Sequence, residues 1–266
     1  MAEPFRNDKF PVRLADGHEV ESVYYGSGTL CISSQAGCAV GCPFCASGKS
    51  GLLRNLSVEE MQLQVDEAGR RGHRPRRITL SGIGEPLHNP AAVARFITLS
   101  ATEGLPVSLT TTGHPLARLE EFLHLPHNGL MLSLHAGSSA LHRRLVPHGA
   151  DFEELWAVLE RHWPLLSRRR RRKLGVNFLL LAGVNDGSAE LQTLAERLRT
   201  FPELTLHLLT CNPVPASPFA SPPDEAVAEI HARLAGQGIN VRRPNPWRVR
   251  LEGGCGTLLL RRGARP

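Results

Sequence analysis

The chain has 266 residues, of which 41% are hydrophobic and 21% are charged, and it carries a formal net charge of +6 at neutral pH. These values exclude a disordered or fibrous class, and the length is sufficient for one large α/β domain. No apolar run reaches the ~18 residues of a membrane span, and the polar N-terminus does not resemble a signal peptide, so we expect a cytoplasmic protein without a membrane partner. The surplus of basic residues is compatible with an anionic partner such as RNA.

Apolar segments rich in β-branched residues recur along the chain, and each predicts a strand. The expected strands are 21–25, 29–34, 76–82, 106–113, 130–137, 174–183, 204–213 and 238–243. Amphipathic segments typical of helices lie between most of them, and the first opens with a capping box formed by Ser57 and Glu60. The expected helices are 57–71, 89–104, 115–125, 151–163, 187–200 and 222–238.

This alternation predicts parallel strands joined by right-handed crossovers, in an open sheet or in a full or partial (β/α) barrel. Polar residues directly follow four of the strands, at 81–86, 110–113, 133–137 and 211–213. Because the carboxyl ends of parallel strands share one rim, we expect a site there. A lone histidine such as His135 would more often be structural, but four such loops together favour a functional rim.

Four of the six cysteines lie within one short stretch: Cys31, Cys38, Cys42 and Cys45. A cytoplasmic chain keeps its thiols reduced, so this grouping favours metal binding or catalysis over disulfides. The last three form C-x-x-x-C-x-x-C. A zinc site would need a fourth ligand from elsewhere, whereas a 4Fe–4S cluster held by three cysteines leaves one iron open to a ligand. Phe44 offers an apolar ring to shield such a cluster.

The spacing of Cys38, Cys42 and Cys45, with an aromatic residue before the third cysteine, resembles the motif of the radical S-adenosylmethionine (radical SAM) superfamily. The resemblance implies that the three thiolates hold a 4Fe–4S cluster, whose open iron binds S-adenosylmethionine and cleaves it reductively to a 5′-deoxyadenosyl radical. The segment "SGIGEP" resembles the Gly-Glu-Pro-like motif of such enzymes, which implies that Gly84 and Glu85 contact the methionine part of this ligand.

The resemblance also implies the architecture. We expect a single domain, 1–266, built as a partial (β/α)6 barrel of the radical SAM type. An N-terminal extension with short strands, 1–30, should precede the barrel core, 31–242. A C-terminal loop and tail, 243–266, should follow the core and carry Cys255.

Further segments narrow the resemblance to one group. "TLCISSQAGCAVGCPFCASGKSGLLRNL", "GIGEPLHN", "SLHA", "GVNDG" and "NPVPASPF" look like the RlmN/Cfr group of radical methyl synthases, and the similarity runs from about residue 16 to the end of the chain. This group methylates carbon 2 or carbon 8 of an adenine in ribosomal or transfer RNA. The resemblance therefore implies an RNA adenine methyltransferase, with carbon 2 favoured, served by an electron donor such as flavodoxin or ferredoxin.

The resemblance implies the same residue roles at the matching positions of this chain. Cys255 would accept a methyl group from one S-adenosylmethionine, and the radical from a second would take a hydrogen atom from that methyl, so that a methylene radical adds to the adenine. Glu21 matches the base that removes the proton from the adduct, and Cys31 matches the thiol that breaks the link between enzyme and RNA. The other expected contacts of S-adenosylmethionine are Thr110, Ser133, His135 and Asn212.

Two departures from the group bear on its function. The helical N-terminal domain usual in this group is not matched, so we expect RNA recruitment to differ, with the basic run from Arg168 to Lys173 as a candidate for part of the phosphate contacts. The carrier motif, usually D-I-x-A-A-C-G-Q-L, reads "RLEGGCGTL" around Cys255. It keeps the Cys-Gly pair and the following Leu.

Three other interpretations stay open. The same cluster and carrier cysteine could serve a small molecule, a nucleotide or a peptide. The enzyme could abstract hydrogen without methylating anything, in which case Cys255 would be dispensable. The chain could instead be a basic RNA-binding protein whose cysteines hold a structural metal ion, which zinc in a metal analysis would support.

Overall fold

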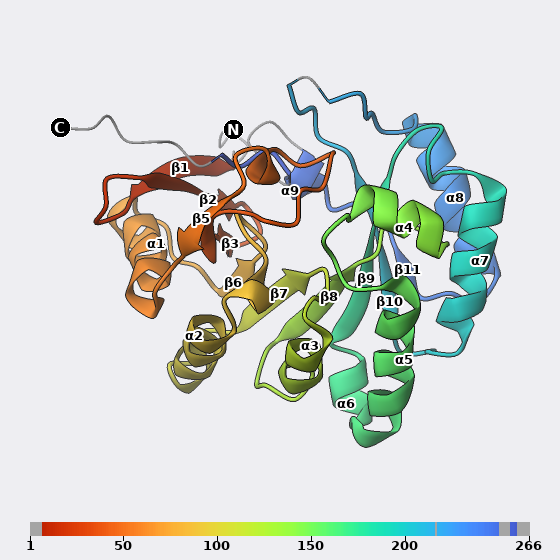
Figure 1. The fold of residues 1–266 in the computed structure, drawn as a ribbon, viewed down its shortest axis with the longest axis horizontal. Coiled ribbons are helices and arrows are strands. Elements are labelled where there is room, and N and C mark those ends of the chain that lie inside the picture. The colour runs from red at the N-terminus through yellow and green to blue at the C-terminus, as the bar shows by residue number, and fades with distance from the viewer. Residues whose placement is uncertain (1–6, 216, 250–255, 260–266) are drawn as a thin grey trace, which may run out of the picture.

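The computed structural model describes residues 7–215, 217–249 and 256–259 (Figure 1). One sheet has nine strands in the order β1-β2-β3-β6-β7-β8-β9-β10-β11, and a small second sheet pairs β4 with β5. The strands of the main sheet are β1 (Asp8–Arg13), β2 (Glu19–Tyr25), β3 (Thr29–Ile32), β6 (Arg77–Leu80), β7 (Val107–Thr111), β8 (Gly129–Ser133), β9 (Leu174–Leu180), β10 (Thr205–Thr210) and β11 (Val241–Arg242). Those of the small sheet are β4 (Gln35–Gly37) and β5 (Leu52–Asn55).

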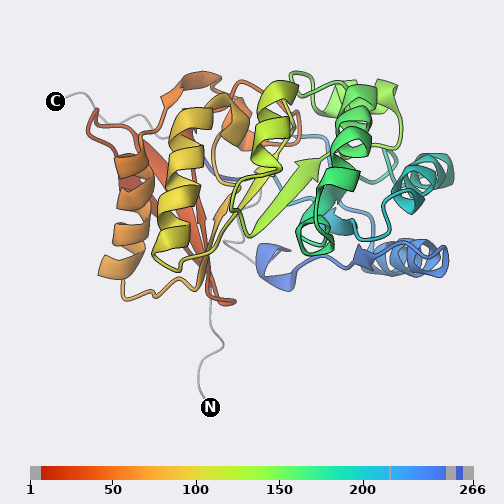
Figure 2. The same ribbon diagram turned by 90° about the horizontal axis from the view of Figure 1, so that it is seen from below.

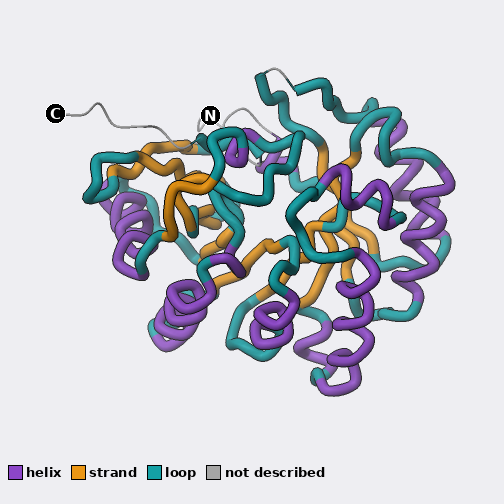
Figure 3. Tube along the Cα trace, in the orientation of Figure 1, coloured by secondary structure: helices purple, strands orange, loops and turns teal. Residues whose placement is uncertain are grey.

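Most of the main sheet is parallel. The strands β1, β2 and β3 form antiparallel pairs, whereas every pair from β3–β6 to β10–β11 is parallel. The sheet curves, and its outside is covered by all but the last of the described helices (Figures 1 to 3). They are α1 (Val58–Arg70), α2 (Pro90–Thr102), α3 (Leu116–Phe122), α4 (Ser139–Leu145), α5 (Phe152–His162), α6 (Arg168–Arg171), α7 (Ser188–Arg199), α8 (Asp224–Gly236) and α9 (Pro246–Val249), with short 3₁₀ turns η1 (Ala46–Gly48), η2 (Pro86–His88) and η3 (Trp163–Leu165).

The order of elements confirms the predicted alternation of strands and helices. Each expected strand and helix is present, and the capping box that opens α1 is formed: the backbone N–H of Glu60 donates to Ser57 Oγ at 3.2 Å, and Ser57 N–H donates to the Glu60 carboxylate at 3.0 Å. The elements absent from the sequence prediction are short ones, such as β4, β5, α4 and α6. None of the described helices is both long and apolar enough to cross a membrane.

The basic run from Arg168 to Lys173 forms the short helix α6 and the turn after it. Ser167 caps this helix, because its Oγ accepts a hydrogen bond from Arg170 N–H at 3.2 Å. The helix directly precedes β9, so the run lies at the amino ends of the parallel strands (Figure 1). The polar strand ends identified in the sequence lie at the opposite rim. An RNA molecule that contacts both regions has to reach along the whole length of the strands.

A buried hydrogen-bond network joins α1 to the first strands. The side chain of Gln64 is fully buried: its Oε1 accepts from Ser22 Oγ at 2.9 Å and from Ser33 N–H at 2.8 Å, and its Nε2 donates to Ser33 O at 2.9 Å. Ser33 Oγ donates to the backbone oxygen of Glu21 and accepts from Ile83 N–H, both at 3.0 Å. The network thereby fixes the chain that leads into β4 against β2 and against the loop after β6.

We predict that Gln64→Leu lowers the free energy of unfolding by about 2–4 kcal/mol, because the Ser22 hydroxyl and the Ser33 amide lose a buried partner. Gln62 is the matched control on the same helix: it is exposed, and its Nε2 donates to Asp66 at 2.9 Å. Gln62→Leu should change the free energy by less than about 0.5 kcal/mol. Urea unfolding of both variants measures the difference, and equal effects would contradict a structural role for Gln64.

Candidate active site

The three motif cysteines lie on the loop between β4 and β5, which is closed at its base by two glycines. Cys38 N–H donates to Gly51 O at 2.9 Å, and a Cβ built on Gly37 would lie 2.1 Å from that same oxygen. Only glycine fits at position 37. The side chains of Cys38, Cys42 and Cys45 are partly buried and pack against an apolar cluster that α4, β9 and the loop itself provide. The chain thus gathers three thiols in one apolar setting.

Burial raises the pKa values of two of these thiols, Cys38 and Cys42. The pKa of Cys38 rises to about 11, through burial first and through smaller effects of the charges on Cys45 and Glu85. Burial also raises the pKa of Cys42 well above its ordinary value, and the charges on Cys45, Cys38 and Glu85 add to the effect. The thiols are therefore close enough to influence one another, and their joint ionisation calls for a positively charged partner.

Among the described residues, no three His, Cys, Asp or Glu side chains form a group that would hold a single metal ion. A structural zinc site needs four ligands around one centre, and the loop supplies three cysteines. An iron–sulfur cube spreads three cysteine ligands over three separate irons, so the sulfurs surround a volume and do not meet at a point. Three partly buried thiols on one closed loop therefore fit a 4Fe–4S cluster better than zinc.

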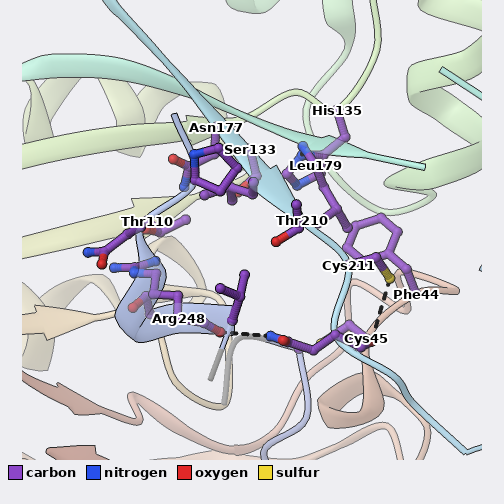
Figure 4. A pocket seen from close by; sticks show the side chains of 17 residues that line it. Phe44, Cys45, Thr110, Ser133, His135, Asn177, Leu179, Thr210, Cys211 and Arg248 are labelled. Atoms are coloured by element: carbon purple, nitrogen blue, oxygen red, sulfur yellow. Dashed lines mark hydrogen bonds between the residues drawn. The ribbon is translucent and has the colours of Figure 1, made fainter. Parts of the chain in front are cut away.

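A cavity of about 140 Å³ opens beside the cysteine loop (Figure 4). Its walls come from the carboxyl ends of β6 to β10, from α9 and from the cysteine loop. Phe44, Cys45 and Cys211 lie at one end of it, and Thr110 and Arg248 lie at the other. Its polar lining residues are Ser81, Thr110, Ser133, His135, Asn177, Thr210, Asn212, Asn245 and Arg248.

The strand register places several of these polar side chains on one face of the sheet. Ser133 of β8 is the partner of Asn177 in β9, and Thr110 of β7 is the partner of Met131, two residues before Ser133. Since side chains alternate along a strand, Thr110, Ser133 and Asn177 all point into the barrel. The sequence prediction contained the first two and missed Asn177. Asn177 lies within an otherwise apolar strand and not at a strand end. The amide side chain in that strand was the feature that could have indicated it.

The Glu85 carboxylate is buried and hydrogen-bonded within the protein. One oxygen accepts from Leu87 N–H at 3.1 Å and from Thr111 Oγ1 at 2.5 Å, and the other accepts from Thr112 N–H at 2.7 Å and Thr112 Oγ1 at 2.9 Å. These four donors occupy the acceptor sites of a carboxylate, while burial raises its pKa. Glu85 thus ties its loop to the end of β7, and a bond to the ammonium group of a ligand would have to replace one of these bonds.

Gly84 allows the loop after β6 to approach β4 closely. Its φ is +110°, and a Cβ built on it would lie 2.6 Å from Cβ of Gln35. Gln35 Oε1 also accepts from Glu85 N–H at 2.8 Å, and its Nε2 donates to Asn55 Oδ1 at 2.7 Å. The space beside Gly84 is therefore filled by protein. Neither Gly84 nor Glu85 lines the cavity described above.

His135 follows β8 in a left-handed backbone conformation, with φ of 57°. Its Nδ1 accepts from Leu179 N–H at 3.0 Å, and its ring meets the edge of Phe44 with the centroids 5.2 Å apart. Burial lowers the pKa of His135 to about 3, so the ring is neutral at neutral pH and carries its proton on Nε2. Its Nε2–H group can therefore donate to a ligand in the cavity. Its ring also packs against Phe44 of the cysteine loop.

Asn212 lines the cavity and also anchors α9. Its Nδ2 donates to Arg248 O at 3.1 Å, and the Arg248 guanidinium lies 6.0 Å from the ring centroid of Tyr25. Asn212 therefore helps to keep α9 in the cavity wall. The sequence prediction missed Asn245 and Arg248, because they follow the last expected strand without any pattern of their own.

Glu21 and Cys31 are buried on the neighbouring strands β2 and β3, and each is only 1% exposed. Cys31 Sγ lies 3.3 Å from the hydroxyl oxygen of Ser81, which lines the cavity. The Glu21 carboxylate accepts from Leu259 N–H at 2.8 Å and lies 3.8 Å from Lys9 Nζ. The structure thus places Cys31 one side chain away from the cavity, and Glu21 against the C-terminal segment.

Cys255 lies outside the described residues, but the chain on both sides of its segment belongs to the cavity region. On the N-terminal side, α9 contributes to the cavity wall. On the C-terminal side, Gly256 lines the cavity and its backbone oxygen accepts from Ala46 N–H at 2.7 Å, next to Cys45. Leu258 is buried, and its backbone oxygen accepts from Ser47 Oγ at 2.8 Å. The tail is therefore bonded directly to the cysteine loop.

Comparison with known proteins agrees with this geometry. The model of the radical SAM superfamily matches residues 32–198. A probable RNA methyltransferase from Rhodopseudomonas palustris is 37% identical over 96% of this chain and 72% of its own length, and a dual-specificity RNA methyltransferase RlmN from Halorhodospira halophila is 34% identical over 94% and 72%. A crystal structure of a radical SAM methyltransferase from Sphaerobacter thermophilus superimposes with a TM-score of 0.86 at 31% identity, over 97% of this chain and 79% of that one.

The chain belongs to the RlmN-like RNA methyltransferases of the radical SAM superfamily. Members of this superfamily use a 4Fe–4S cluster and S-adenosylmethionine, so these are the cofactors of this RlmN-like enzyme. The fold expected from the sequence, an α/β structure of the radical SAM type with a mostly parallel sheet, is confirmed. An RNA-binding protein with a merely structural metal ion is excluded by the same relationship.

The raised pKa of Cys38 predicts how this RlmN-like enzyme reacts with alkylating agents before its cluster is loaded. A thiol with a pKa of about 11 is mostly protonated at pH 8, so its alkylation by iodoacetamide should accelerate about 10-fold per pH unit up to pH ~10. Peptide mass spectrometry after timed labelling measures this rate. An ordinary thiol would level off above pH ~9, and such a plateau would contradict the buried site.

Proposed function

We propose that this enzyme methylates a carbon of an adenine, carbon 2 in the first instance, in ribosomal or transfer RNA, and that Cys255 carries the methyl group. The observation that carries the proposal is the bonding of the tail to the cysteine loop, through Ala46 N–H to Gly256 O at 2.7 Å. Cys255 directly precedes Gly256, and Gly256 lines the cavity that begins at Cys45. A methyl carrier has to reach both the methyl donor and the radical, and a cysteine next to Gly256 in the chain suits this requirement.

Three cysteines, Cys38, Cys42 and Cys45, would hold the cluster. When bound, the cluster supplies the electron that cleaves S-adenosylmethionine and so yields a carbon radical able to take a hydrogen atom from a methyl group. Residues of the chain exclude water from this site. Phe44 is 9% exposed, and its ring packs in a T-shaped arrangement against the neutral ring of His135. Exclusion of water protects a radical from side reactions.

The cavity would hold S-adenosylmethionine along the strand ends. Thr110, Ser133 and Asn177 offer hydroxyl and amide groups from three neighbouring strands, which suit the ribose and the adenine. His135 offers a single Nε2 donor, and Asn212 keeps α9 in the wall. Gly84 and Glu85 would act mainly by shaping the loop that borders β4, because their side-chain space and acceptor sites are taken by protein groups.

Resolution of the enzyme–RNA adduct would fall to Glu21 and Cys31. Glu21 is buried, and its carboxylate accepts from the backbone N–H of Leu259, four residues after Cys255 in the chain. Cys31 Sγ lies beside Ser81, at the cavity wall. The adduct radical would first lose a proton to Glu21 and one electron, which the cluster held by the three cysteines would accept. The Cys31 thiolate would then attack the sulfur of Cys255. The bond between that sulfur and the methylene carbon would break with its electron pair on the carbon, a solvent proton would complete the methyl group, and a disulfide would remain. We place this reaction in the cytoplasm, where a thiol system restores both cysteines.

The proposal predicts a specific isotope pattern in the product. With S-adenosylmethionine that carries three deuterium atoms on its methyl group, the adenine methyl group should retain two of them, because one deuterium leaves to the radical and a solvent proton replaces it. The lost deuterium should appear in 5′-deoxyadenosine. Mass spectrometry of nucleosides from ribosomal and transfer RNA measures both. A methyl group that retains all three atoms would indicate direct transfer, and no methylated adenine would point to another substrate.

A further inference from the structure

Helix α4 covers the outside of the cysteine loop. Its buried residues Leu141 and Leu145, and Val146 directly after it, belong to the same apolar cluster as the motif cysteines. His148 closes the space beside the loop, since a Cβ built on Gly41 would lie 3.8 Å from its Cδ2. Figures 1 and 2 show α4 beside this loop in two perpendicular views. Aliphatic side chains of α4 therefore form the cover over the cysteines on this side of the molecule.

The outward face of α4 is basic. Arg143 and Arg144 are exposed on the helix, and His148 is exposed three residues beyond its end; we refer to these three residues as the basic face of α4. Within residues 7–215, 217–249 and 256–259, neither arginine takes part in an ion pair. Lys49 is the only charged residue in the segment 38–51. The positive charge over the cysteine loop is thus not cancelled by the loop itself.

Two carboxylates near the amino end of α4 already have partners. Glu190 accepts from Gly137 N–H at 2.6 Å and from Ser138 Oγ at 2.5 Å. Glu153 lies 2.5 Å from a guanidinium nitrogen of Arg197. Glu153 is therefore paired with a cation, and Glu190 is held by hydrogen bonds from Gly137 and Ser138. The two exposed arginines of the basic face give the surface over the cysteines a positive potential.

We propose that the basic face of α4 is the docking surface for a small acidic protein that carries one low-potential electron, of the flavodoxin or ferredoxin class. The inference rests on the proposed function, in which the cluster has to be reduced before S-adenosylmethionine is cleaved. One electron leaves the reduced cofactor of the carrier and enters the oxidised cluster, so the carrier is oxidised by one electron and the cluster is reduced by one. No atom and no proton passes between the two proteins.

Position and charge favour an electron carrier over RNA at this face. Electron transfer weakens steeply with distance, so a carrier has to approach close to the cluster, and α4 packs directly against the cysteine loop. The cavity that would admit an adenine is bordered by α9 and by the strand ends, not by α4. Redox partners form small, charge-steered interfaces, which a short basic helix can supply, whereas RNA binding usually needs a longer track of cations.

The test measures cluster reduction alone, without RNA. Holoenzyme is mixed anaerobically with reduced flavodoxin, and loss of the cluster's visible absorbance gives the rate of reduction across a range of salt concentrations. The test variant is Arg143→Gln/Arg144→Gln, and Arg143→Lys/Arg144→Lys keeps the charge. Arg95→Gln/Arg233→Gln is the matched control: it removes the same net charge from exposed sites on α2 and α8. Dithionite, a small reductant, tests whether each cluster is intact.

At low salt, Arg143→Gln/Arg144→Gln should be reduced by flavodoxin about 10-fold more slowly, with a flatter salt dependence, while the lysine variant and the matched control stay near the wild-type rate. All variants should react with dithionite at the same rate. An unchanged flavodoxin rate in the glutamine variant, or an equal loss in the matched control, overturns the proposal. So does weakened RNA binding with normal reduction, which would assign the face to RNA. Failure of RNA methylation would leave these rates unaffected and would bear only on the proposed function.

Discussion

The site depends on one close backbone contact, the approach of Gly37 to the carbonyl oxygen of Gly51. A Cβ at position 37 would meet that oxygen at 2.1 Å, so the loop can close only around a glycine. Closure gathers three cysteines into an apolar setting, and burial there raises the pKa values of Cys38 and Cys42. The same loop donates hydrogen bonds from Ala46 and Ser47 to Gly256 and Leu258, so the groups that would hold the cluster lie beside the segment that follows Cys255 in the chain.

A second layer of polar bonds holds this loop against the barrel. Gln64 fixes Ser33 ahead of the loop, and Gln35 fixes the Gly-Glu-Pro segment through the backbone of Glu85. The Glu85 carboxylate then binds Thr111 and Thr112 at the end of β7. Each of these bonds is buried, so each is expensive to break. These buried hydrogen bonds connect β2, the cysteine loop and the strand ends that line the cavity.

The sequence could predict features that are encoded locally. The alternation of strands and helices follows from the spacing of hydrophobic residues along the chain. The three motif cysteines lie within eight residues of one another, and polar residues such as Thr110 and Ser133 come at the ends of predicted strands. It could not predict contacts between distant parts of the chain. Ser47 bonds to Leu258 across 211 residues, and Glu21 bonds to Leu259 across 238. Two of the internal partners of Glu85, Thr111 and Thr112, likewise lie at the end of another strand, so its carboxylate was expected to be open to a ligand when its acceptor sites are in fact occupied.

The central claim is that Cys255 carries the methyl group despite the altered residues around it. The most direct measurement is peptide mass spectrometry of enzyme reconstituted anaerobically with iron and sulfide and then given methyl-labelled S-adenosylmethionine without RNA. We expect the labelled methyl group on the peptide that contains Cys255, and none on the peptide that contains Cys211, the other cysteine near the tail. An intact cluster with no label on Cys255 would contradict the claim and would favour an enzyme that only abstracts hydrogen.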